Sequence, residues 1–254
     1  PFVHRLADEL GLTGYVGNDL EGVFMEVQGE QVGAFLRRLR ADAPAICHID
    51  SVTSEEADVR QESGFRIVSS QGGDGAATTS IPADAAVCQD CLAELRDPLD
   101  RRFDYPFIAC TNCGPRYTMV TGLPYDRANT AMADFPLCAA CEAEYGDPRS
   151  RRYHAQPTAC GDCGPRLSMP VADVAAALRT GRIAIKGVGG YHLACDANSA
   201  LAVGSLRERK QRGDKPFAVM VANLGVARAI ADIDQPACDL LESGARPIVL
   251  LPSK

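Results

Sequence analysis

The chain has 254 residues, of which 46% are hydrophobic and 23% charged, and its formal net charge is -7 at pH 7. This length allows one large domain or two to three small ones, and the apolar fraction excludes a disordered or fibrous protein. The acidic balance excludes a general basic surface for nucleic acid, and no apolar run is long enough to span a membrane, so we expect a cytoplasmic protein that requires no nucleic acid.

The first seventy residues have the periodicity of a small α+β sandwich. We expect helices over 2–10 and 32–39, a turn at 19–22, and strands over 13–18, 23–28, 46–52 and 65–68. The sheet of such a sandwich would lack its leading strand. Because the chain also begins at Pro1 and ends at Lys254 directly after a strand-like run, we predict that it is a fragment.

Two further segments follow a connector predicted at 71–80, which is rich in Ser, Gly, Ala and Thr. Residues 81–169 contain most of the cysteines. Residues 170–254 alternate between helical and extended patterns, which is typical of an α/β domain. There we expect helices over 171–180, 199–210 and 224–230, and strands over 182–186, 217–221 and 246–251.

Eight of the eleven cysteines form four CxxC pairs, and nothing in the sequence indicates export. The pairs are Cys88/Cys91, Cys110/Cys113, Cys138/Cys141 and Cys160/Cys163. Eighteen residues separate the two pairs within each copy, and twenty-four separate the copies. Residues 88–119 and 138–169 share fifteen identities in thirty-two positions, which indicates an internal duplication.

Two CxxC pairs in each repeat predict a closed metal site. Each pair lets one tight turn direct two sulfurs at the same ion, and two turns supply the four thiolates of a tetrahedral zinc site with no open position for a substrate water. We therefore predict two structural zinc ions. Such a site contributes about 10–16 kcal/mol of folding free energy in small peptides, so we expect this segment to need metal to fold. A thioredoxin-type redox dithiol is the alternative, but it needs only one pair.

The spacing leaves open which two CxxC pairs share one metal ion. Either each repeat closes its own site, which the duplication favours, or the outer pairs and the inner pairs combine. Both repeats also carry Arg-Arg-aromatic, at 101–103 and 151–153, for which we expect a solvated face, with phosphate binding as the alternative. His154 replaces Asp104 and is expected on a domain-facing surface rather than at a metal. The remaining cysteines, expected to be buried as small apolar residues, are Cys47, Cys195 and Cys238.

The cysteine string, with Arg-Arg-Tyr-His-Ala-Gln-Pro at 151–157 and Cys-Gly-Pro-Arg after each repeat, resembles the HypF family, the carbamoyltransferases of NiFe-hydrogenase maturation. The resemblance covers the whole chain and implies an α+β multidomain fold. Its parts would be a ferredoxin-like, acylphosphatase-like sandwich without its first strand at 1–70, tandem zinc modules at 81–169, and the first half of a YrdC-like nucleotide-binding domain at 170–254.

The acylphosphatase-like part of the resemblance implies one catalytic residue. Asn18 matches the asparagine that holds the attacking water in acylphosphatases, although the residues alone favour an ordinary hairpin-turn asparagine. The phosphate-binding loop and its arginine would precede Pro1. Because no guanidinium would then offset the phosphoryl charge, we expect this fragment to be inactive as an acylphosphatase.

The YrdC-like part of the resemblance implies a basic nucleotide site. Its matching residues are Lys186, Lys210, Arg212 and Lys215. A basic run at a helix end is ordinarily solvated and favoured by the helix dipole. Here the run lies beside a glycine-rich turn, which favours phosphate binding.

The resemblance implies that carbamoyl phosphate and ATP yield carbamoyl-adenylate, with magnesium as the companion of ATP. The carbamoyl group would then pass to the C-terminal cysteine of the partner HypE, and we expect this fragment alone not to complete that reaction. Two other functions compete: a non-enzymatic zinc-binding module of the chaperone type, and a tRNA threonylcarbamoyl-adenylate synthase. The zinc repeats argue against the second, because those enzymes lack them.

Overall fold

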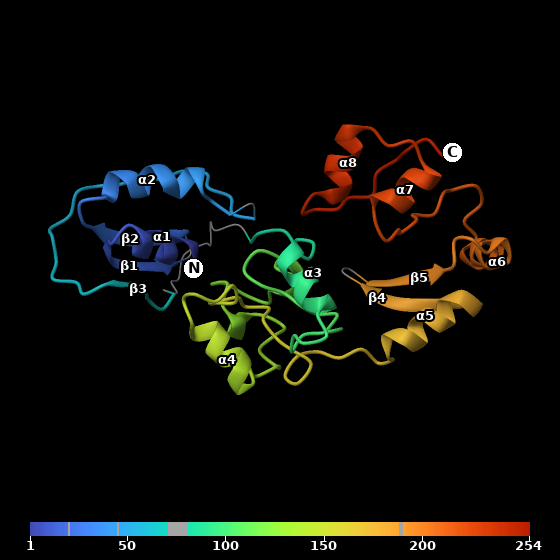
Figure 1. The fold of residues 1–254 in the computed structure, drawn as a ribbon, viewed down its shortest axis with the longest axis horizontal. Coiled ribbons are helices and arrows are strands. Elements are labelled where there is room, and N and C mark those ends of the chain that lie inside the picture. Colours follow the sequence, from blue (N-terminus) through green and yellow to red (C-terminus); the bar gives the residue numbers. More distant parts are fainter. Residues whose placement is uncertain (20, 45, 71–80, 188–189) are drawn as a thin grey trace. The chain divides into compact units, whose positions relative to one another are not determined.

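The structure is a computed structural model, and it describes residues 1–19, 21–44, 46–70, 81–187 and 190–254. The connector predicted at 71–80 lies outside the described residues. The chain divides into two compact units, Pro1–Pro165 and Arg166–Lys254. Each unit contains helices and one small sheet (Figure 1), as the α+β multidomain prediction requires. Among the described residues, no helix is both long and apolar enough to cross a membrane.

The first unit begins with a small sandwich of two helices and three strands. Its elements are α1 (Phe2–Glu9), β1 (Thr13–Asn18), β2 (Val23–Gln28), α2 (Val32–Ala41) and β3 (Phe65–Ile67). The strand order is β2-β1-β3, with β2 antiparallel and β3 parallel to β1. Leu6 of α1, Phe35 of α2 and Val16 of β1 belong to one buried cluster, so both helices pack on this sheet as their apolar periodicity predicts.

The strand predicted over 46–52 is wrong. These residues form no strand, and all of them are half-buried or exposed. An extended apolar pattern becomes a strand only where an open sheet edge can pair with it. Here residues 46–52 pair with neither edge strand of the sheet, β2 or β3, and Val52 only packs against the sandwich core.

The cysteine-rich part of the first unit has two short helices, one per repeat. They are α3 (Gln89–Arg96) and α4 (Ala139–Gly146), and the short 3-10 turns η1 (Tyr117–Met119) and η2 (Arg127–Asn129) follow α3. One buried cluster joins Tyr105 and Ile108 of the first repeat to Ala159 of the second. The two repeats therefore share a core that neither could form alone.

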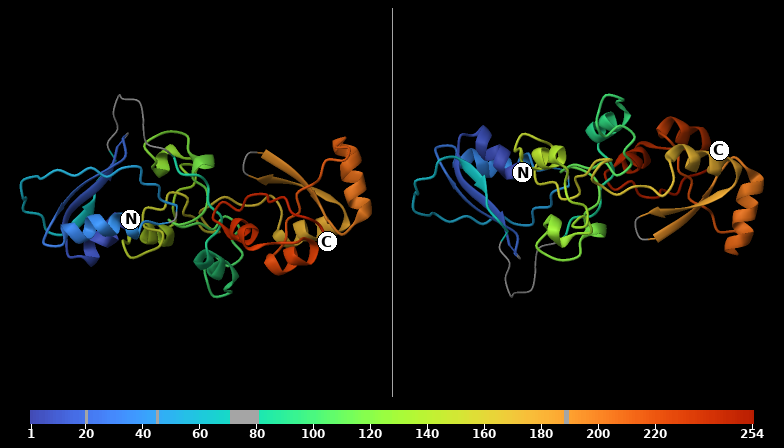
Figure 2. Two further views of the ribbon diagram at one scale, coloured as in Figure 1. Left: turned by 90° about the horizontal axis from the view of Figure 1, so that it is seen from above. Right: turned by 90° about the horizontal axis from the view of Figure 1, so that it is seen from below.

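The second unit is a hairpin with helices before and after it. Its elements are α5 (Val171–Thr180), β4 (Arg182–Gly187), β5 (Gly190–Cys195), α6 (Ala200–Lys210), α7 (Leu224–Ile230) and α8 (Gln235–Glu242). The two strands pair antiparallel, α5 contacts both of them, and α6 contacts β5 (Figure 2). Side chains of Ser199, Asn223 and Asp234 accept hydrogen bonds from backbone N–H groups in the first turns of α6, α7 and α8 and fix where these helices begin.

The strands predicted over 217–221 and 246–251 are wrong. Both stretches are irregular, and neither joins a ladder with another described strand. None of their apolar side chains is buried, and Met220 is 98% and Leu250 88% exposed. A strand is stabilised by cross-strand pairs, so an apolar run without a pairing partner stays irregular.

Candidate metal centres

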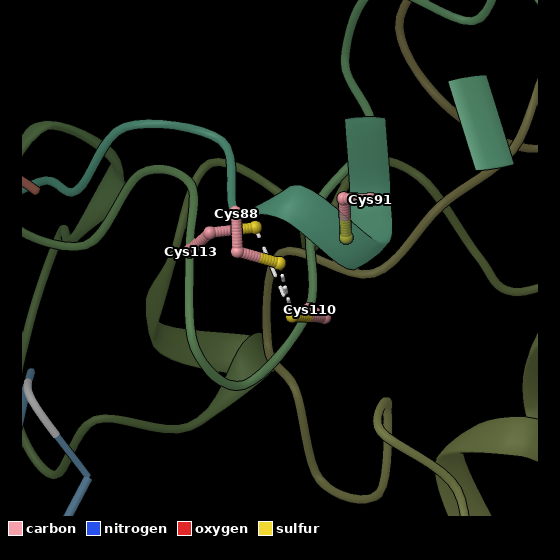
Figure 3. Close-up of side chains that lie close together, drawn as sticks. All are labelled: Cys88, Cys91, Cys110 and Cys113. Carbon is pink, nitrogen blue, oxygen red and sulfur yellow. Dashed lines mark hydrogen bonds between the residues drawn. The ribbon is translucent and has the colours of Figure 1, made fainter. Parts of the chain in front are cut away.

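The eight paired cysteines gather into two groups of four, one in each repeat. Within each group the sulfur atoms all lie within 4.8 Å of one another. Figure 3 shows the first group, to which the start of α3 contributes Cys88 and Cys91 and a loop contributes Cys110 and Cys113. Each repeat therefore brings its own four sulfurs together, which is the pairing that the duplication favours.

The sulfur spacing fits one tetrahedral zinc ion per group. Zinc–sulfur bonds of 2.3 Å place two thiolates of a tetrahedron about 3.8 Å apart. In the first group Cys110 Sγ lies 3.8 Å from Cys88 Sγ and 3.7 Å from Cys113 Sγ. In the second group neighbouring sulfurs are 3.6 to 3.8 Å apart. All eight cysteines are free, so no disulfide competes for these positions.

Each group is half helical and half loop, which follows from where the CxxC pairs lie. Cys88 is the N-cap of α3 and Cys91 lies in its first turn, and Cys138 and Cys141 have the same positions in α4. The unpaired N–H groups and the dipole at a helix start favour thiolates there. The backbone N–H of Cys141 lowers the pKa of Cys138 to about 7.

Burial has the opposite effect on the pKa of Cys141, the second cysteine of α4. Burial raises the pKa of Cys141 to about 12. A buried thiol of this kind does not ionise alone near neutral pH, because removing its proton would leave a desolvated charge. The group of four thus needs nearby positive charge, which a divalent ion and basic side chains can supply.

The loop half of the first group depends on Gly114 and Arg116. Gly114 has φ +92°, and a Cβ there would lie 2.7 Å from the Cβ of Ala109. The side chain of Arg116 is buried and donates hydrogen bonds to the carbonyls of Cys110 at 2.9 Å and Cys113 at 3.1 Å. The arginine of the Cys-Gly-Pro-Arg motif therefore holds the loop of the first site in place. In the second repeat Arg166 is exposed.

The solvated face expected for the paired arginines is wrong for the second arginine of each pair, while Arg101 is exposed and Arg151 half-buried. Arg102 is 1% and Arg152 4% exposed. Each donates to the sulfur of a helical cysteine in the opposite repeat, Arg102 to Cys141 at 3.5 Å and Arg152 to Cys91 at 3.8 Å. A guanidinium tolerates such burial because its planar fork finds a carboxylate, a carbonyl and a thiolate at once.

Glu94 and Glu144, the carboxylates that receive these arginines, were not among the residues expected at the sites. Arg101 and Arg102 both pair with Glu144, whereas Arg151 and Arg152 both pair with Glu94. The signal that could have found them lies in the duplication. Both copies carry a glutamate three residues after the second cysteine and both carry the two arginines, although nothing in a single repeat requires these charges.

The structure places the other predicted residues of the repeats as follows. His154 belongs to neither sulfur group of the described residues, and its ring packs against Tyr145 and Tyr153. Tyr153 also contacts His4 of α1, with ring centroids 5.7 Å apart. Of the unpaired cysteines only Cys238 is buried, since Cys47 is exposed and Cys195 half-buried, so their expected burial is wrong for those two.

Asn18 is the last residue of β1 and is exposed. It stands opposite Val23 of β2, at the end of the hairpin. The side chain that fastens this turn is that of Asp19, whose Oδ1 accepts hydrogen bonds at 2.8 Å from the N–H groups of Glu21 and Gly22. Asn18 is thus available to solvent rather than used by the turn.

The four predicted nucleotide-binding residues lie in two groups within the second unit. Lys186 is on β4, and its ammonium nitrogen lies 5.7 Å from the ring centroid of Tyr191. The second group is at the end of α6 and in the next loop and consists of Lys210, Arg212 and Lys215. These three side chains and that of Lys186 are exposed. Arg212 and Arg207 both contact the Phe217 ring, at 5.4 and 4.9 Å from its centroid.

Three known families match successive parts of the chain. The acylphosphatase family matches residues 1–67, the HypF finger matches 87–120 and 137–169, and the Sua5, YciO and YrdC family, described as telomere recombination, matches 176–254. An acylphosphatase-like part, tandem four-cysteine fingers and a YrdC-like part in one chain define a multidomain zinc-finger protein.

Curated relatives with the same combination narrow the class to one family. The chain is 53% identical to carbamoyltransferase HypF2 of Cupriavidus necator, over 99% of its own length and 33% of the relative, and 53% identical to HypF of Rhizobium leguminosarum bv. viciae, over 100% and 33%. It superposes on full-length HypF in the phosphate- and nucleotide-bound form with a TM-score of 0.94 and 43% identity, covering 100% of this chain and 35% of that one. The chain belongs to the HypF family, and it spans about a third of the length of these relatives.

Proposed function

We propose that this chain is part of a carbamoyltransferase that uses carbamoyl phosphate and ATP to carbamoylate a cysteine of the partner HypE for NiFe-hydrogenase maturation in the cytoplasm. The observation that carries this proposal is the identity of 46 to 53% with proteins named HypF carbamoyltransferases, along 99 to 100% of the chain. Similarity that runs through all three parts favours the activity of the whole relative over that of any one part.

The proposed reaction has three steps. Water releases carbamate and inorganic phosphate from carbamoyl phosphate. A carbamate oxygen then attacks the α-phosphorus of ATP, which forms carbamoyl-adenylate and expels pyrophosphate. The cysteine thiolate of HypE finally attacks the carbamoyl carbon, forms a C–S bond and releases AMP.

The second step brings two anions together, and positive charge from the protein has to offset their repulsion. Lys186, Lys210, Arg212 and Lys215 are proposed to supply that charge, with magnesium bound to the nucleotide. All four side chains are exposed, Lys186 on β4 and the other three at the end of α6 and in the loop that follows it, where they can contact phosphate oxygens. The HypF structure that this chain resembles is a phosphate- and nucleotide-bound form, which supports a nucleotide as a ligand of the whole protein.

The two sulfur groups are proposed to hold one structural zinc ion each, through Cys88, Cys91, Cys110 and Cys113 and through Cys138, Cys141, Cys160 and Cys163. The HypF finger match and the sulfur spacing support this role. Zinc would supply folding free energy and no reaction step, because four thiolates close its coordination shell. Asn18 is proposed to orient a water at the acylphosphatase-like part.

The first test measures nucleotide turnover in a full-length protein that contains this chain. We expect AMP and pyrophosphate to form from ATP only when carbamoyl phosphate is present. Lys186→Ala or Lys215→Ala should raise the KM for ATP about tenfold, the effect of losing one charge-assisted hydrogen bond of about 1.5 kcal/mol.

Arg179→Ala is the matched control, since Arg179 is an exposed cation of the same unit near the end of α5. Its KM for ATP should match that of the parent. Turnover that proceeds equally well without carbamoyl phosphate would contradict the proposed reaction. Equal KM values for all three variants would contradict the proposed nucleotide residues.

A further inference from the structure

We propose that the arginine pair of each repeat, Arg101-Arg102 or Arg151-Arg152, is an outer-sphere part of the metal site in the opposite repeat, so that neither zinc centre is complete without the other repeat. The inference rests on the two zinc sites proposed above and goes beyond them, because it assigns to each site side chains that lie outside its own repeat.

Arg102 of the first repeat connects the two halves of the second site. Its guanidinium donates to Glu144 on α4 at 2.5 and 3.0 Å, and its Nε donates to the carbonyl of Ala159 at 2.9 Å. Glu144 lies one turn after Cys141, and Ala159 directly precedes Cys160. One buried side chain thus ties the helical CxxC pair of the second site to its loop pair.

Arg152 of the second repeat makes the reciprocal connection in the first site. Its guanidinium donates to Glu94 on α3, and its Nε donates to the carbonyl of Ala109 at 3.2 Å. Glu94 lies one turn after Cys91, and Ala109 directly precedes Cys110. Arg102 and Arg152 have equivalent partners, and in both cases the partners belong to the opposite repeat. The duplicated repeats therefore exchange their arginines instead of using them within the same repeat.

The neighbouring arginines add direct contacts to the sulfurs. Arg101 donates to Cys141 Sγ at 3.1 Å, and Arg151 donates to Cys91 Sγ at 3.6 Å. Four thiolates and one zinc ion carry a net charge of -2, which is costly to bury unless cations lie close by. Two guanidiniums from the opposite repeat offset that charge, and the shared glutamate holds both of them in place.

Supports from elsewhere in the chain differ between the sites. Arg116 fastens the loop half of the first site within its own repeat. Arg127, in the segment between the repeats, donates to the carbonyls of Gln156 at 2.6 Å and Thr158 at 2.8 Å next to the second site. Among the described residues, the exchanged arginine pairs join α3 or α4 of one repeat to arginines of the other, so they couple the two sites.

The test follows the exposure of individual cysteines in zinc-loaded protein. N-ethylmaleimide is added with a zinc chelator, and peptide mass spectrometry gives the initial labelling rate of each cysteine. In Arg102→Ala the cysteines of the second repeat should react about 10- to 100-fold faster than in the parent, as expected for lost outer-sphere support, and ahead of those in the first repeat. Arg152→Ala should produce the opposite order.

Arg149→Ala is the matched control, since this arginine of the second repeat has a 92% exposed side chain. It should leave all eight rates unchanged. If Arg102→Ala prevents folding, Arg102→Lys is the second variant, because it keeps the positive charge but loses the planar guanidinium. In this variant the cysteines of the second repeat should still react before those of the first, with a smaller increase in rate. Equal acceleration of both repeats, or faster labelling of the first repeat in an Arg102 variant, would overturn the inference. The zinc proposal itself would stand in that case if the parent contains two zinc ions.

Discussion

Glu94 and Glu144 are the residues on which the exchanged arginines converge. Each lies three positions after a helical cysteine, so its carboxylate and the sulfur project from one face of α3 or α4. Burial by itself would raise the pKa of Glu144, but hydrogen bonds from Arg102 and Arg101 outweigh it and lower the pKa to about 2. Glu144 is therefore ionised at neutral pH and compensates part of the charge of its arginine pair.

Replacing Glu144 by glutamine should destabilise the zinc-loaded protein by about 1.5–3 kcal/mol, the range for a hydrogen bond to a charged group. The amide keeps the shape of the side chain but removes the negative charge beside the buried Arg102. Chemical denaturation at neutral pH measures the free energy of unfolding. Glu142→Gln, at an exposed position of the same helix, is the control. Equal effects of the two substitutions would contradict this role of Glu144.

The stability difference between the parent and Glu144→Gln should also depend on pH. Because the pKa of Glu144 in the folded protein lies below its ordinary value of 4.5, its contribution to stability is complete above 4.5 and is lost as the pH falls from there towards 2. The difference in unfolding free energy should shrink across this window. A difference that grows on acidification would contradict the ion pairs with Arg101 and Arg102.

At the residue scale, the sequence predicts which cysteines form a group, but it does not predict which side chains contact their sulfurs. The CxxC pairs are local, and the duplication favours one closed site per repeat. The arginines reach sulfurs that are 39 to 63 residues away along the chain. Without the fold nothing distinguishes them from a solvated face, because paired arginines on a small module are usually exposed.

At the element scale, the helices and strands with clear periodicity or caps could be predicted. The sandwich elements α1, β1, β2 and α2 begin within a residue of their predicted positions. The helices α3 and α4 have no predicted counterpart, because eight residues are too few for a clear period and the cysteine that starts each is not a usual cap. Asp234 followed by Pro236 is a usual helix start, and it could have identified α8.

The conformation of the loop that contains Cys110 and Cys113 should depend on Gly114. Gly114→Ala places a Cβ against Ala109 at a positive φ and should cost about 1–3 kcal/mol of stability. Thermal unfolding of the zinc-loaded protein measures the loss. Gly122→Ala is the control, since a Cβ there would meet nothing within 4 Å. A Gly114→Ala protein as stable as the Gly122→Ala protein would show that the loop tolerates a side chain.

At the scale of the whole molecule, the two repeats form a single structure. Tyr105 of the first repeat donates a hydrogen bond to the carbonyl of Pro165 in the second at 3.4 Å, and the buried cluster contains residues of both. The sequence predicts that a repeat with few apolar residues needs metal. It does not predict that the repeats share their core and exchange their arginines, since both depend on contacts distant in sequence.

The number of zinc ions bound to the intact chain tests the proposed structure of the central segment most directly. Native mass spectrometry of the reduced protein, prepared without chelator, should show a mass that corresponds to two zinc ions. Cys88→Ser or Cys163→Ser should lower that number and unfold the central segment, because each substitution opens one site. A folded protein with fewer than two bound zinc ions, or with disulfides among the eight cysteines, would contradict two closed and mutually supported zinc sites.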